Sequence, residues 1–136
     1  EPKRDDIIVF IYPHDRSKDF IKRVIGTAGD KIEIKNKKIF INDQEYEDRF
    51  GVHSDSVVFP ASLQPRDNFG PVVVPPHCVF VMGDNRNDSA DSRFWGFVDL
   101  KDVEGKAMII YWSWNREEKE NILRKLRWNR LGMLLH

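Results

Sequence analysis

The chain has 136 residues, which is enough for a single domain with its own hydrophobic core, and its 22 basic residues are balanced by 22 acidic residues. A net charge of zero supplies no overall positive field, so we expect no nucleic-acid partner. Hydrophobic residues make up 40% of the chain, which argues against disorder, and no apolar run approaches the roughly 20 residues of a membrane-spanning helix.

Two strands are predicted near the start of the chain. The first, at residues 7–12, is an apolar run that ends at Pro13, and the second, at residues 20–25, ends at Gly26. A strand this close to the first residue suggests that the chain is a fragment of a longer protein.

The middle of the chain predicts a hairpin and an irregular segment. Residues 31–41 alternate with period two on both sides of the polar turn 35–38, and residues 43–71, with scattered turn residues, are expected to form an excursion from the main sheet. Further strands are expected at 72–74, 79–82 and 107–112, and a helix at 116–130. The pattern predicts one mainly β domain over residues 1–136, with antiparallel pairing and few short helices.

The second strand carries two adjacent cations, Lys22 and Arg23. Period two places Lys22 on one face and Arg23 on the other, so one cation is expected to reach solvent while the other is partly buried. Burial lowers the pKa of an ammonium group, and the neutral amine is then available as a general base. The alternative is a lysine that extends its charged end past the sheet edge into water.

A polar stretch, GDNRNDSADSRFWG at residues 83–96, separates two apolar runs. Its residue types are those of an ordinary surface loop. A second interpretation is that Asp91 and Arg93 form a bidentate ion pair that clamps a tight turn and directs the Ser89 hydroxyl toward an amine. Ser92, the other hydroxyl nearby, is expected to cap the turn.

Four segments resemble the motifs of bacterial type I signal peptidases. FIKRVIGTAGD, residues 20–30, resembles their lysine-bearing motif, which is usually close to YIKRVVGLPGD, and GDNRNDSADSRFWGFV, residues 83–98, resembles GDNRDNSxDSRxWGxV. RDDIIVFIYP, residues 4–13, is similar to their RGDIVVFxxP strand, with Asp5 where the family commonly has glycine. LRWNRLG, residues 126–132, is similar to their C-terminal pattern. The segments occur in the family's order.

The resemblance implies the antiparallel β catalytic domain of a Ser–Lys endopeptidase that removes signal peptides from exported pre-proteins. By position, Lys22 matches the general base, Ser89 the hydroxyl that orients this base, and Asp91 and Arg93 the ion pair that holds the site. The enzyme would act at the outer, periplasmic side of the bacterial cytoplasmic membrane, with pre-proteins and the lipid surface as partners and without a cofactor.

The same resemblance predicts where a substrate would bind and what the chain would lack. The substrate would lie as an added β-strand beside Asp19, Phe20 and Ile21, and Val9, Phe20 and Ile21 would line pockets for small residues. The family's nucleophilic serine belongs to a Ser-Met-x-Pro motif that precedes the first strand, and its membrane anchor lies further upstream. We therefore expect that the chain as written contains the base without its nucleophile and is inactive alone.

Other functions are considered beside this one. No G-x-S-x-G motif is present, and the histidines and the single cysteine lack metal-ligand spacing, so neither a histidine triad nor a metal site is expected at His14, His53, His77, His136 or Cys78. A related Ser–Lys maturation peptidase and a non-catalytic peptide-binding β domain remain alternatives. The C-terminal region is rich in basic and aromatic residues, and it has two interpretations: packing in the core or contact with anionic lipid. Its residues are Trp112, Trp114, Arg124, Lys125, Arg127, Trp128 and Arg130.

Overall fold

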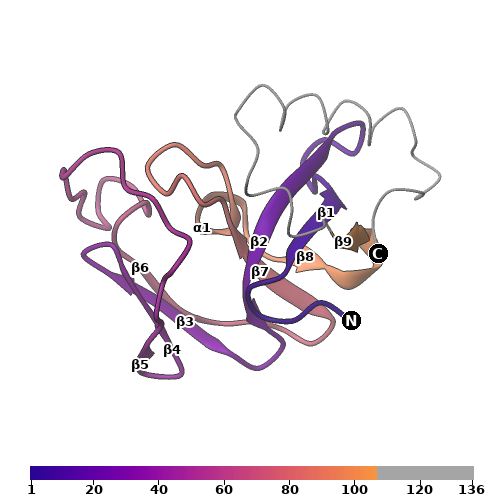
Figure 1. Ribbon diagram of the computed structural model, residues 1–136, viewed down its shortest axis with the longest axis horizontal. Helices are drawn as coiled ribbons and strands as arrows, with labels where there is room; N and C mark the ends of the chain where they lie inside the picture. The colour runs from indigo at the N-terminus through magenta and orange to yellow at the C-terminus, as the bar shows by residue number, and fades with distance from the viewer. Residues whose placement is uncertain (107–136) are drawn as a thin grey trace.

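The computed structural model describes residues 1–106, which form two antiparallel β-sheets (Figure 1). In chain order the elements are β1 (Ile7–Ile11), β2 (Asp19–Thr27), β3 (Lys31–Lys35), β4 (Lys38–Ile41), β5 (Gln44–Glu45), β6 (Phe69–Val73), β7 (Cys78–Met82), α1 (Ser92–Trp95), β8 (Val98–Asp99), the 3₁₀ helix η1 (Leu100–Asp102) and β9 (Val103–Lys106).

The five-stranded sheet has the order β8-β7-β2-β1-β9, and the four-stranded sheet has the order β5-β4-β3-β6. Each pair of neighbouring strands is antiparallel. The predicted fold class is therefore confirmed. The predicted hairpin is also present, because β3 and β4 are joined at Asn36 and Lys37, whose positive φ angles of 48° and 73° suit a two-residue hairpin turn.

Most of the elements that the sequence pattern did not predict lie in or directly after the polar stretch. This stretch contains α1, and β8, η1 and β9 follow it, none of which was predicted. The range 43–71 contains β5, the start of β6 and a bridge between Val52 and Asn85 that connects it to the polar stretch. The strand expected at 107–112, the helix expected at 116–130 and the basic and aromatic C-terminal region lie outside the described residues.

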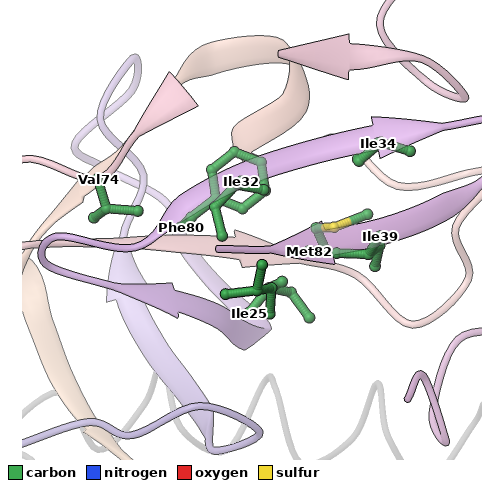
Figure 2. Packing of buried hydrophobic residues seen from close by; sticks show 8 residues of the cluster. Ile25, Ile32, Ile34, Ile39, Val74, Phe80 and Met82 are labelled. Atoms are coloured by element: carbon green, nitrogen blue, oxygen red, sulfur yellow. The ribbon is translucent and has the colours of Figure 1, made fainter. Parts of the chain in front are cut away.

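One hydrophobic core fills the space between the two sheets. Figure 2 shows side chains from both sheets meeting there; the buried members are Ile25, Ile32, Ile34, Ile39, Ile41, Val74, Phe80 and Met82. Strand alternation explains this set, because in β3 the isoleucines at positions 32 and 34 face inward while Glu33 between them does not. Gly26 permits the close approach of the sheets, since a Cβ atom there would lie 2.6 Å from Ile32 Cδ1.

A second core lies on the opposite face of the five-stranded sheet. Its buried residues are Ile8, Phe10, Val24, Val79, Val81 and Val98. Phe20 of β2 and Trp95 of α1 pack against them. Because Phe20, Lys22 and Val24 alternate along one face of β2, the Lys22 side chain belongs to the face that α1 covers.

Candidate active site

Strand register places Lys22 beside the first residue of the polar stretch. β2 pairs with β1 along residues 19–23, whereas its pairing with β7 begins at Arg23, opposite Met82. In this antiparallel register, the residue that follows Met82 comes alongside Lys22. The chain leaves β7 there as Gly83 and enters the loop that leads to α1.

The Lys22 amine and the Ser89 hydroxyl are in direct contact. Lys22 Nζ lies 3.1 Å from Ser89 Oγ, although the two residues are 67 positions apart in the chain. Ser89 is buried and Lys22 is largely covered. Burial is the main cause that lowers the pKa of Lys22 below its ordinary value; the Asp91 charge opposes this shift, and the Arg93 charge adds to it. The pair thus combines a hydroxyl with an amine that loses its proton more readily than a lysine in water.

Gly83 makes this contact sterically possible. A Cβ atom at position 83 would lie 2.1 Å from Ser89 Oγ and 3.3 Å from Lys22 Nζ. The first distance is far inside van der Waals contact, so a side chain at this position and the observed Ser89 position are mutually exclusive. Gly83 is the first residue of the polar stretch, but no local pattern marks it as a site residue, because its place beside Lys22 depends on the register of β2 and β7.

Asp91 and Arg93 form the predicted bidentate ion pair. Arg93 Nε and Nη2 each lie 2.9 Å from a carboxylate oxygen of Asp91, and both residues are buried. Asp91 is also the N-cap of α1, where it accepts the Arg93 backbone N–H, and it accepts the Gly83 N–H at 3.1 Å. One carboxylate therefore fixes the start of the loop, the start of the helix and the guanidinium.

Ser92 has a different role from the one expected. Asp91, not Ser92, caps α1, whereas Ser92 Oγ accepts the backbone N–H of Val81 in β7 at 2.9 Å. This bond fastens α1 to the central part of the five-stranded sheet. Ser92 is buried, and its hydroxyl connects α1 to β7.

Two further arginines of the motif regions are ion-paired and buried. Arg23 binds Asp84 through two nitrogen–oxygen contacts of 3.1 and 3.2 Å, and Arg86 binds Asp48 and donates to the Gly83 carbonyl at 2.8 Å. Arg23 is only 3% exposed, so it is the more deeply buried of the two adjacent cations in β2. Its partner Asp84 has a pKa that burial raises.

The residues predicted to bind substrate lie along the N-terminal half of β2 and on its neighbour β1. Phe20 and Ile21 are half-buried, whereas Asp19 and Val9 are buried. Within the described part of the chain, residues 19–22 of β2 pair with β1 along one edge, and β7 does not extend alongside them. This edge is the position at which an added strand would have to lie.

The described residues hold no group of three or more His, Cys, Asp or Glu side chains arranged for a metal ion. In the same part of the chain, none of the helices has the length and apolar character required to cross a bilayer.

Comparison with known proteins identifies relatives of the chain. A family profile described as "Signal peptidase, peptidase S26" matches residues 1–112. A signal peptidase I of Leptolyngbya laminosa is 37% identical over 123 residues, which cover 85% of this chain and 55% of the relative. A signal peptidase I of Bacillus caldolyticus is 35% identical over 118 residues, which cover 84% of this chain and 64% of the relative. The chain thus spans less than two thirds of the length of either relative.

A solved structure shares the fold. The crystal structure of a signal peptidase I from Enterococcus faecalis V583 superposes with a TM-score of 0.63 at 29% sequence identity, and the match covers 79% of this chain and 97% of that chain.

Proposed function

The chain belongs to the signal peptidase family, peptidase S26, and on this basis we propose that it is the catalytic domain of an endopeptidase that removes signal peptides from exported pre-proteins. The observation that supports the proposal most directly is the 3.1 Å contact between the covered Lys22 amine and the Ser89 hydroxyl. Burial lowers the pKa of the Lys22 amine, so its neutral form, which can act as a general base, is reached at a lower pH than in an ordinary lysine.

In the proposed mechanism, Lys22 moves the protons of a serine-type acyl transfer. The neutral amine takes the proton of the attacking serine hydroxyl while the serine oxygen bonds to the scissile carbonyl carbon. The resulting ammonium then gives its proton to the leaving nitrogen as the C–N bond breaks. In the second half, Lys22 accepts a proton from a water molecule as the water oxygen bonds to the ester carbonyl carbon. The Lys22 ammonium then gives this proton to the serine oxygen as the ester C–O bond breaks, which releases the acid product and restores the serine hydroxyl and the neutral amine.

Ser89 is assigned the role of orienting the amine rather than attacking the substrate. It is buried against Gly83, and Asp91 and Arg93 hold the turn on which it lies. We assign the attack to a serine outside residues 1–136, in the Ser-Met-x-Pro motif that the family resemblance implies. The same segment would supply donors for the developing oxyanion.

The proposed substrate is an extended peptide that adds to β2. Residues 19–21 offer backbone groups to it, and side chains of Val9, Phe20 and Ile21 contribute to pockets for small residues. The proposed place of action is the outer face of the bacterial cytoplasmic membrane, where both pre-protein and lipid surface would be met. The even balance of acidic and basic residues gives no support to a nucleic-acid substrate.

Replacing Lys22 in the full-length protein tests the proposal. Lys22→Ala should abolish processing of a pre-protein with an Ala-x-Ala site, and Lys22→Arg should do nearly as badly because a guanidinium keeps its proton at neutral pH. Activity of the unchanged protein should rise with pH as the Lys22 amine loses its proton, along a limb displaced below that of an ordinary lysine.

Lys38→Arg serves as the control, since Lys38 is an exposed lysine of β4. Processing rates are measured by gel for all three variants, together with circular dichroism to verify the fold. Near-normal turnover by Lys22→Arg would remove Lys22 from the role of general base.

A further inference from the structure

The tip of the β3–β4 hairpin contacts the loop that carries Ser89. Lys37, at this tip, donates from Nζ to Asp67 Oδ1 at 2.9 Å and to Asn87 Oδ1 at 3.1 Å. Its side chain is 13% exposed, so the amine is largely removed from water. A lysine of the four-stranded sheet is thereby bound to a residue two positions before Ser89.

Asn87 uses both ends of its amide. Its oxygen accepts from Lys37, and its Nδ2 lies 3.2 Å from the Asp55 carbonyl and 3.4 Å from Ser54 Oγ. An ammonium group can only donate, so it requires the amide oxygen, and a carbonyl can only accept, so it requires the amide nitrogen. Asn87 is 9% exposed, and this pair of contacts needs an amide rather than a carboxylate.

Asp67 connects these contacts to the Arg93 guanidinium. Asp67 is 1% exposed and accepts from Lys37, from the Phe59 backbone N–H and from Arg66 Nε. The carbonyl of the preceding residue, Arg66, accepts from Arg93 Nη1 at 2.7 Å. Residues 66–67 are therefore connected to the Ser89 loop on both sides, through Lys37 to Asn87 before Ser89 and directly to Arg93 after it.

Figure 1 shows the same arrangement at the level of the ribbon, where the segment between β5 and β6 runs beside the loop that precedes α1. Ser89 lies between two anchored points of that loop. The Ser89 hydroxyl has little room to move, because it contacts Lys22 on one side and packs against Gly83 on another. A shift of the loop therefore changes the environment of the Lys22 amine.

We propose that Asn87 and Lys37 are positioning residues for the Lys22–Ser89 pair, and that the amide of Asn87 holds the Ser89 loop against residues 54–55 and the hairpin tip. The catalytic meaning of this role rests on the function proposed above, whereas the effect on Lys22 itself does not. Both residues act through Ser89 and neither touches the reacting groups.

Asn87→Asp is the direct test, performed on the chain of residues 1–136. The carboxylate keeps an acceptor for Lys37, loses the donors to residues 54 and 55, and places a negative charge against the Asp55 carbonyl. The loop should separate from that segment, water should reach Lys22, and the Lys22 pKa should rise toward its ordinary value. The readout is the titration of Lys22 followed by NMR of its ¹³Cε–¹⁵Nζ group.

Two control variants distinguish positioning from general destabilisation. Asp88→Asn changes the exposed neighbour of Asn87 and should leave the Lys22 titration unchanged. Ile32→Val removes a methylene from the core between the sheets, near the end of β3 that is remote from the hairpin tip, and should lower the unfolding temperature without moving the titration. If Asn87→Asp fails to fold, Lys37→Met interrupts the same connection from the other side, and the same upward shift is expected.

An unchanged Lys22 titration in a folded Asn87→Asp or Lys37→Met variant would overturn the proposal, and so would an equal shift in Ile32→Val. In the full-length protein, the catalytic counterpart is a fall in kcat with little change in KM, up to the roughly 10²-fold that a displacement on the order of 1 Å costs. If Lys22→Ala retained processing while Asn87→Asp still shifted the titration, the proposed function would fail and the positioning role would stand.

Discussion

Burial and nearby charges act on the Lys22 amine in opposite directions. Removal from water lowers its pKa, as does the Arg93 charge, while the Asp91 and Asp84 charges raise it. The net lowering means that the folded chain binds a proton at Lys22 less tightly than the unfolded chain. Within the pH range between the two pKa values, the unfolded state holds more protons, so stability must rise with pH.

Lys22→Met should therefore stabilise the domain most at pH values at which Lys22 is charged in the folded state. The advantage of the variant should be largest below the folded-state pKa of Lys22 and should shrink as pH rises through it toward about 10.4, the unfolded value. Thermal unfolding of both proteins at a series of pH values from neutral to alkaline measures this difference. Two curves that stay parallel over the whole range would show that burial does not depress the Lys22 pKa.

Gly83→Ala should displace Ser89 from Lys22. The added methyl group would fall 2.1 Å from Ser89 Oγ, so the hydroxyl has to move, and in the full-length protein a displacement on the order of 1 Å costs about 10²-fold in rate. A processing assay and a crystal structure of the variant measure the two effects. Gly29→Ala is a useful comparison, since a Cβ there meets no atom within 4 Å, although its positive φ adds local strain. Normal activity with Ser89 unmoved would contradict the steric role of Gly83.

At the scale of elements, α1 matters as an anchor for the polar stretch rather than as a helix. With only residues 92–95, it cannot be stable alone, and its position depends on the Asp91 cap, the Asp91–Arg93 pair and the Ser92 bond to β7. The loop that carries Ser89 is thus suspended between the end of β7 and the start of α1.

Asp91→Asn should lower stability and activity together. The change leaves the Arg93 guanidinium buried without its counter-charge, and breaking a buried pair in this way costs on the order of 3–5 kcal/mol. Urea unfolding measured beside pre-protein processing tests the link. Asp43→Asn is the control: Asp43 is an exposed aspartate at the β4–β5 turn, and its removal should change the free energy of unfolding little. Lost processing with unchanged stability and an unmoved Ser89 would argue against a scaffold role for Asp91.

At the scale of the whole molecule, the two sheets and the segment between β5 and β6 enclose the polar stretch from several sides. The core between the sheets brings the β3–β4 hairpin into range of the loop, and the ion pairs of Lys37, Arg66 and Arg86 complete the contact. Lys22, Ser89 and the Asp91–Arg93 pair that anchors the loop therefore lie within the described part of the chain.

We expect the purified chain of residues 1–136 to fold and to leave a pre-protein with an Ala-x-Ala site uncleaved. The two hydrophobic cores are expected to be sufficient for folding. No cleavage is expected, because Ser89 is proposed to orient Lys22 while another segment supplies the attacking serine and oxyanion donors. The loss of even one oxyanion donor costs about 10²–10³ in rate. Incubation with the pre-protein and mass spectrometry of the products is the test. Site-specific cleavage that disappears in Ser89→Ala would identify Ser89 as the nucleophile instead.

Local patterns in the sequence determined a large part of this protein. Period-two alternation predicts β3 and β4, and short apolar segments that end at turn residues predict β1, β2 and β7, because both patterns describe a single strand without reference to its neighbours. Asp91 and Arg93 are two positions apart, so their pairing also follows from a short stretch of chain. The motif resemblance led to Lys22 and Ser89 as a pair, but the residues alone left Lys22 open to a solvated position.

Only the tertiary structure decided which distant groups meet and how far water reaches. The register of β2 and β7 sets Gly83 beside Lys22, and packing of the two sheets brings Lys37, Asp67 and Asn87 together from three separate parts of the chain. No local pattern carries such contacts, because they depend on how whole sheets stack. The pKa of Lys22 is decided in the same way, since burial is a property of the folded chain and not of the residues on either side of it.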